Sequence, residues 1–179
     1  MAKIAIVGNG PSRELYNGFD GDVCVCNIPQ LDIAYDFISI VDKKAMDYIH
    51  RENLVFDKPI LTTPEIEKQT RNWKLKTEVQ PVLEIKLMNS AATAAYYFAQ
   101  IKQYDTIYLY GCNALWSDVV TSHQDELIPR PHRNSTLHIQ WRSHWKKVWQ
   151  TGKEFVIVHP KDTKPEDYGE NVLWYTRSC

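Results

Sequence analysis

Short runs of apolar residues recur along the chain at intervals that leave room for a helix between them. Several runs, the first above all, are almost continuously apolar, which is typical of strands buried on both faces of a parallel sheet. The predicted strands cover residues 3–8, 22–27, 36–42, 58–63, 106–112 and 154–160. Segment 78–88 contains Pro81, so we predict an edge strand or an extended connection there.

The segments between these runs carry residues that begin helices. Asp42 is a candidate N-cap for a helix over 43–53, and Thr63 is one for a helix over 63–73. The alanine-rich segment 89–104 is the clearest helix of the chain. Alternation of strands and helices predicts an α/β fold, with one doubly wound, mostly parallel, Rossmann-like sheet.

The chain has 179 residues, a length that suits one domain, and no repeat or linker composition divides it. We therefore expect a single domain over residues 1–179. One segment, 114–135, is polar and irregular and directly follows a predicted strand. Long loops at the carboxyl edge of an open α/β sheet are typical of ligand-binding lids, so we predict a lid, with a passive surface insertion as the alternative.

Charge and cysteine usage narrow the class of protein. The formal net charge of -1 provides no overall attraction to nucleic acid or to an anionic membrane. Met1-Ala2-Lys3 leads directly into a strand, and no segment approaches the roughly 18 apolar residues of a membrane span, so we expect a cytoplasmic protein. The four cysteines, expected to be reduced, are Cys24, Cys26, Cys112 and Cys179. They form no CxxC pair, and we expect no metal site.

The first strand ends in the sequence GNGPS, residues 8–12, which is a candidate ligand loop. Glycines allow the backbone to approach a ligand, and a helix beginning near Ser12 would direct free N–H groups at the same point. The alternative is a tight turn in which Asn9 tolerates a left-handed backbone. The spacing is neither GxGxxG nor a P-loop, but its position at the carboxyl end of a strand favours ligand binding.

Polar residues also end the next two predicted strands. Because the carboxyl ends of parallel strands meet at one edge of a sheet, Asn9, Asn27 and Asp42 are expected to line one rim. Their amide and carboxylate groups suit ribose hydroxyls or a base edge. Asn89 and Ser90 begin the alanine-rich helix, where they serve as a cap and as a candidate anion site. Each of these residues taken alone is also explained as a helix cap.

The segment 127–153 contains six Lys or Arg, three His and no acidic residue, which marks either a site for an anion or a solvated basic face. Part of it, 135–150, has helical periodicity. The stripe predicted to face the core consists of Leu137, Trp141, Trp145 and Val148. His138 follows the predicted lid directly, where an imidazole can act as a general base.

Taken together, these residues resemble the bacterial lipooligosaccharide-type sialyltransferases, which use CMP-activated sialic acid. In that family a first strand ends in GNGPS and a second in Cys-Asn, matched by Cys26-Asn27. An alanine-rich helix then leads to a strand ending in Gly-x-Asp, matched by 111–113 with Asn113 in the acidic position. A final strand ending in proline matches 154–160.

The resemblance implies sugar transfer from a nucleotide donor to a hydroxyl of a glycan-like acceptor, with His138 as general base and no metal or other cofactor. The nucleotide site that it implies consists of Gly8, Asn9, Gly10, Pro11, Ser12, Asn27, Asp42, Asn89, Ser90, Gly111 and Asn113. The family's lid carries tyrosines that contact the leaving phosphate, whereas residues 114–135 contain none. We expect Arg130 and Arg133 to neutralise that phosphate instead, with His132 and Ser122 as further candidates.

Three other functions are compatible with the sequence. One is a Mg²⁺-dependent, Rossmann-like enzyme that transfers pyrophosphate to a pterin alcohol, since such enzymes have a GxGPS turn. Another is a non-catalytic module that binds or sequesters a nucleotide. Binding of nucleic acid through the basic helix is the least favoured, because its tryptophans follow the periodicity of a core. The sequence leaves the oligomeric state open.

Overall fold

The apolar runs form one parallel sheet in the computed structural model, which describes residues 2–30 and 32–178. Its strands are β1 (Lys3–Val7), β2 (Asp22–Cys26), β3 (Phe37–Ser39), β4 (Ile60–Leu61), β5 (Val79–Gln80), β6 (Thr106–Tyr110), β7 (Glu154–His159) and β8 (Val172–Thr176). They lie in the order β5-β4-β3-β2-β1-β6-β7-β8, and each pairs in parallel with its neighbours. The predicted α/β class is confirmed, with a fully parallel arrangement of the described strands.

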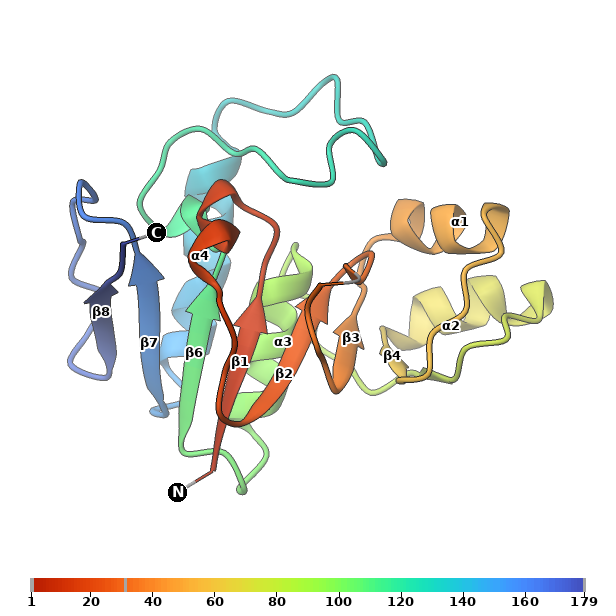
Figure 1. Cartoon of the computed structure of the whole chain (residues 1–179), viewed down its shortest axis with the longest axis horizontal. Coiled ribbons are helices and arrows are strands. Elements are labelled where there is room, and N and C mark those ends of the chain that lie inside the picture. Colours follow the sequence, from red (N-terminus) through yellow and green to blue (C-terminus); the bar gives the residue numbers. More distant parts are fainter. Residues whose placement is uncertain (1, 31, 179) are drawn as a thin grey trace.

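Helices cover both faces of this sheet (Figure 1). They are α1 (Lys43–Arg51), α2 (Pro64–Thr70), α3 (Ser90–Ala99) and α4 (Leu137–Trp149), with short 3-10 helices η1 (Pro11–Leu15), η2 (Arg71–Trp73) and η3 (Asn113–Leu115). The predicted caps are present: Asp42, Thr63 and Asn89 each accept a hydrogen bond from a first-turn amide of α1, α2 and α3.

Alternation along β1 divides the core into two layers. Ile4 and Ile6 pack with α3 and α4, whereas Ala5 and Val7 pack on the opposite face with α1 and α2. Trp145 of α4 is 2% exposed and stacks on Trp149 with ring centroids 5.1 Å apart. The large apolar content of α4 therefore belongs mostly to the core, as the helical periodicity predicts.

The order in which successive strands are added to the sheet changes direction at β1. From β1 the strands are added in one direction as far as β5, and β6 then pairs on the other side of β1. Open α/β sheets bind ligands at such a switch point, outside the carboxyl ends of the strands. The predicted lid follows η3 and passes over the carboxyl ends of the strands (Figure 1).

The edge strand predicted in segment 78–88 is present, whereas one further strand, β8, was not predicted from the sequence. Segment 78–88 contributes a two-residue edge strand, β5, which ends immediately before Pro81, as the missing N–H of proline requires. Strand β8 was not predicted, because it follows a polar stretch and leaves Leu173 and Tyr175 about half exposed. Its pairing with β7 depends on a contact that the local pattern does not contain. None of the helices in residues 2–30 and 32–178 has the length and apolar content needed to cross a membrane.

Candidate functional site

A cavity of about 750 Å³ lies at the carboxyl edge of the sheet, where the order of strands changes direction between β1 and β6. Its walls come from the loops after β1, β2, β3 and β6, from the start of α3, from one side of α4 and from the lid. The predicted site residues that line it are Gly8, Asn9, Gly10, Asn27, Asp42, Asn89, Ser90, Gly111, Asn113, Arg130 and Arg133. Pro11, Ser12 and His138 are not among its lining residues.

The glycines after β1 are explained by the neighbouring loop. The Gly8 amide donates to the Tyr110 carbonyl at 2.7 Å, and the Gly10 amide donates to the Gly111 carbonyl at 2.8 Å. A Cβ on Gly8 would lie 2.9 Å from the Gly111 carbonyl oxygen, closer than real Cβ atoms approach. The two loops therefore pack backbone to backbone, and at least part of the requirement for glycine arises from this contact.

Asn9 uses its whole side chain within the protein. Its Nδ2 donates to the Cys26 carbonyl at 2.9 Å, which ties the ends of β1 and β2 together. Its Oδ1 accepts from Arg13 at 3.1 Å and from Gln124 of the lid at 3.3 Å. The side chain of Asn9 thus holds the rim and the lid in place. Its role in the site is first of all structural, because these hydrogen bonds form within the protein.

Asn113 performs the same task between β1 and β6. Its Oδ1 accepts from the Ser12 amide at 2.9 Å and from the Ser12 hydroxyl at 2.6 Å. The predicted free N–H at the start of the helix near Ser12 is therefore directed at Asn113. No described residue accepts from the Nδ2 of Asn113, which leaves this donor for the cavity that the residue lines.

The rim between β2, β3 and α3 contains two more amides. The Ser90 hydroxyl donates to Asn27 Oδ1 at 3.0 Å and accepts from the Val41 amide at 3.2 Å. Asn27 adopts the left-handed conformation, with φ 61°, which asparagine tolerates better than most residues. Asn89 caps α3 through its oxygen, while its Nδ2 is buried with no partner among the described residues. A buried unpaired donor is costly, so Asn89 is a position where a bound acceptor group would add stability.

The lid is held down by hydrogen bonds and ion pairs. Gln124 is 3% exposed, and its side chain both accepts from the Ile28 amide at 3.1 Å and donates to the Ile28 carbonyl at 2.7 Å. Arg133 binds Asp125 through two nitrogens at 2.9 and 3.0 Å. These hydrogen bonds lower the pKa of Asp125. Arg130 forms an ion pair with Asp42, which joins the lid to the cap of α1.

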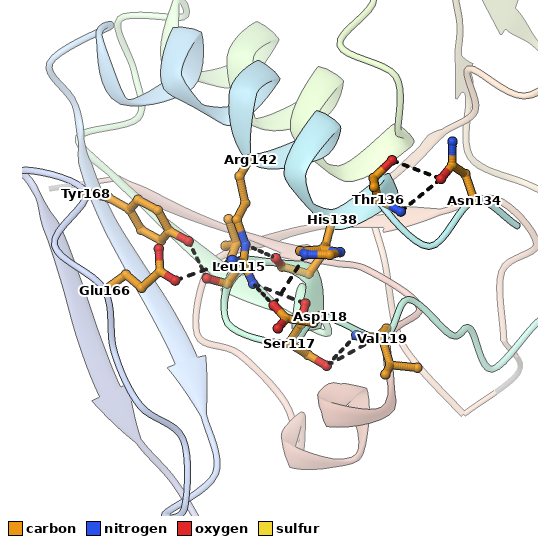
Figure 2. Close-up of polar contacts among 11 residues, drawn as sticks. Leu115, Ser117, Asp118, Val119, Asn134, Thr136, His138, Arg142, Glu166 and Tyr168 are labelled. Carbon is orange, nitrogen blue, oxygen red and sulfur yellow. Dashed lines mark hydrogen bonds and ion pairs between the residues drawn. The ribbon is translucent and has the colours of Figure 1, made fainter.

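His138 lies beside the base of the lid (Figure 2). Its Nε2 is 3.4 Å from a carboxylate oxygen of Asp118, and its side chain is 12% exposed. Arg142, one turn further along α4, donates to the carbonyls of Ala114 and Ser117 at 2.7 and 3.1 Å. The predicted general base therefore belongs, in this conformation, to a cluster that anchors the start of the lid to α4.

Several residues that line the cavity were not predicted from the sequence. They include Lys43, Lys44, Lys86, Gln124, Asp125 and Trp141, the last of which was assigned to the core. The pair Lys43-Lys44 directly follows the strand-end residue Asp42, and this was a signal that could have revealed it. Lys86 had no such signal, because it lies in the connection between β5 and α3 and not directly after a strand.

The charged lining is strongly basic. Five Lys and Arg side chains face two carboxylates, Asp42 and Asp125, which is a net charge of +3 in a chain whose formal net charge is -1. His132 and Ser122, the further candidates for holding phosphate, also line the cavity. Such a local excess of positive charge attracts anionic ligands.

Cysteine chemistry is not favoured at this site. Cys26 and Cys112 line the cavity, and both are buried. Burial raises the pKa of the Cys112 thiol to about 12 and that of Cys26 well above its ordinary value. Both thiols are thus protonated at neutral pH, whereas a cysteine nucleophile acts as the thiolate. Within the described residues, no three His, Cys, Asp or Glu side chains are grouped to hold a metal ion.

The fold and the site together define a Rossmann-like α/β protein with a lidded, basic cavity at the switch point of its sheet. Comparison with known proteins gave no match to a family model, to a curated protein or to a solved structure.

Proposed function

We propose that this chain binds a nucleotide or nucleotide sugar in the cavity and transfers the sugar to an acceptor hydroxyl. The observation that carries the proposal is the position of the cavity at the β1/β6 switch point, where open α/β sheets bind ligands. A lid that covers the site would exclude water from an activated donor. The net charge of +3 on the lining suits the phosphates of such a donor.

The rim offers donors for the remaining polar groups of the ligand. The oxygens of Asn27, Asn89 and Asn113 are all engaged within the protein, which orients each amide. Their nitrogens have no acceptor among the described residues and can bind carbonyl, hydroxyl or phosphate oxygens. A ligand rich in acceptors, such as a nucleotide, is therefore favoured over a cationic or apolar one.

In the proposed reaction the acceptor oxygen forms a bond to the anomeric carbon of the donor, and the bond from that carbon to the phosphate oxygen breaks. The acceptor proton passes to an imidazole, and the nucleotide leaves as an anion. His132 lines the cavity and its side chain is exposed, so we assign the base to His132 in the conformation described. The assignment of the base to His138, implied by the resemblance, requires its ring to leave Asp118 first.

Binding is tested by thermal shift with CMP, UDP, GDP and ATP. A ligand at 100 times its Kd stabilises the folded protein by about 2.7 kcal/mol, which is readily detected. The variant Ala91→Trp places a large side chain in the lining and is expected to abolish the shift. Gln69→Trp, on the exposed side of α2, is its control. The proposal fails if none of the four nucleotides raises the Tm of the wild-type protein.

Turnover of nucleotide sugars separates the two histidines. We expect His132→Ala to lower kcat by about 100-fold or more while nucleotide affinity stays within a few-fold, since general bases contribute factors of this size. His138→Ala is expected to have a smaller effect, through the lid. The opposite result would assign the base to His138, and tight binding without any turnover in the wild type would indicate a nucleotide-sequestering module.

A further inference from the structure

The cavity has two chemically different ends. At the β3 end its lining includes Lys43, Lys44 and Lys86, all exposed, next to the start of α3. At the opposite end, beyond β6, α4 contributes the half-buried Leu137 and Trp141. In the strand order, β3, which precedes Lys43 and Lys44, and β6, which precedes α4, lie on opposite sides of β1.

The excess positive charge is concentrated at the β3 end. Arg133 is paired with Asp125 within the lid, and Arg130 is paired with Asp42. Lys43 places its Nζ 5.8 Å from the ring centroid of Trp73. Lys44 and Lys86 take part in no ion pair among the described residues, so their ammonium groups are available to an anion.

Two further features at this end suit a ligand with many oxygens. The Nδ2 of Asn89 is buried without an acceptor, directly before α3 begins at Ser90. Arg130 reaches from the lid to Asp42. Its guanidinium could bind an anionic ligand in addition to the Asp42 carboxylate. Phosphate oxygens would therefore find both charge and hydrogen-bond donors here.

The α4 end suits a flat apolar group. Trp141 was predicted as part of the core stripe, but it is less buried than Trp145 and Val148 on the same helix and also lines the cavity. Leu137 lies one turn before it. Indole rings bind nucleobases by stacking, which needs no charge and accepts any of the bases.

We infer that the ligand of this cavity binds in one orientation, with its phosphates at Lys44, Lys86 and Arg130 and its base or another flat ring at Trp141. This inference rests on the proposed function and adds to it the direction of the ligand and its class. The ligand carries at least two negative charges, and a nucleoside diphosphate group fits this cavity better than a monophosphate.

The test uses isothermal titration calorimetry of the full chain with inorganic pyrophosphate, CMP and CDP. We expect CDP to bind at least tenfold more tightly than CMP. The double variant Lys44→Ala/Lys86→Ala is expected to weaken both pyrophosphate and CDP at least tenfold. Its matched control is Lys102→Ala, an exposed lysine between α3 and β6, outside the cavity lining, which should change neither.

The variants Trp141→Leu and Trp141→Phe test the other end. We expect Trp141→Leu to weaken CDP about tenfold and to leave pyrophosphate unchanged, while Trp141→Phe retains most of the affinity for CDP. CDP, but not pyrophosphate, should quench tryptophan emission in the wild type, and Trp141→Phe should remove that quenching. A change in pyrophosphate affinity as large as that in CDP affinity would contradict the orientation.

The outcomes separate this inference from the function on which it rests. If nucleotides bind and neither the lysine nor the tryptophan variants change their affinity, the orientation is wrong and the proposed function stands. If pyrophosphate binds through the lysines but CMP, CDP, UDP, GDP and ATP bind no more tightly than pyrophosphate, the cavity recognises phosphate alone and the proposed recognition of a nucleotide is refuted.

Discussion

The polar residues at the rim are first of all structural. Asn9, Asn113 and Ser90 each bond to groups that are distant in the sequence but adjacent at the carboxyl edge of the sheet. Loops at this edge have left the ladder of the sheet, and their backbone groups need other partners. Short amide and hydroxyl side chains supply these partners and leave a few oriented donors for a ligand.

Gly111 is the position where this packing is tightest. It has φ 67°, and a Cβ there would overlap the Gly8 carbonyl. We predict that Gly111→Ala lowers the free energy of unfolding by about 3 kcal/mol, because a strained backbone and a displaced loop both contribute. Urea denaturation measures the loss.

The matched control is Gly152→Ala. Gly152 also has positive φ, 78°, but a Cβ there would have no atom within 4 Å. Its substitution should cost about 1 kcal/mol, from the backbone conformation alone. Equal losses in the two variants would show that the contact between the β1 and β6 loops contributes nothing to stability.

At the scale of elements, the lid behaves as an ordered part of the fold. Gln124 is inserted between Asn9 and the backbone of Ile28, and the His123 amide donates to the Asn9 carbonyl at 2.7 Å. The Arg133–Asp125 and Arg130–Asp42 pairs hold its second half. A ligand can therefore enter only if some of the lid contacts break. The ion pairs are partly exposed, so they break more readily than the contacts of a buried core.

The Asp125 contact is expected to depend on pH. Its pKa is lowered in the folded protein by the hydrogen bonds from Arg133, so the carboxylate stabilises the fold above its unfolded pKa of about 3.9. That stabilisation is lost as the pH falls through the lower, folded pKa. We predict that Asp125→Asn is less stable than the wild type by up to about 1 kcal/mol near pH 7, and that the difference vanishes in acid.

Urea denaturation between pH 2 and pH 7 measures this effect. Asp162→Asn is the control, since Asp162 is exposed and forms no ion pair among the described residues. It should show no difference from the wild type that depends on pH. A gap for Asp125→Asn that persists at the lowest pH would mean that the lid does not depend on the charge of this carboxylate.

At the scale of the whole molecule, one sheet lies between two core layers, and its strands contribute side chains to both. Ile49 of α1 is fully buried in one layer, while Trp145 and Trp149 are buried in the other. Since each strand contributes alternate residues to both layers, neither layer is expected to persist without the other. The chain should therefore unfold as one cooperative unit.

The variant Ile49→Ala tests this cooperativity. It is expected to lower stability by about 2–5 kcal/mol, the usual cost of removing a buried isoleucine side chain. Trp73 packs against the same layer as Ile49, and the other five tryptophans belong to or pack against the opposite layer. The midpoints measured by tryptophan fluorescence and by far-UV circular dichroism should nonetheless shift together. A fluorescence midpoint that does not move would reveal two independent units.

The sequence by itself determined the class of the fold and the ends of its main elements. Apolar periodicity and caps such as Asp42, Thr63 and Asn89 are local signals, because burial on a face and the first turn of a helix involve residues close in the chain. The strand ends also predicted part of the cavity lining, including Asn9, Asn27, Asp42 and Asn113. Strand β8 escaped prediction because its burial depends on a neighbour.

Only the tertiary structure decided which of these residues meet and what each has left to offer a ligand. Asn113 reaches Ser12 across 101 positions of sequence, and Arg130 reaches Asp42 across 88. The order of strands also brings Lys86 to the same rim as Lys44 and leaves His138 at the base of the lid. Such contacts arise from the path of the whole chain, and no local pattern of residues encodes them.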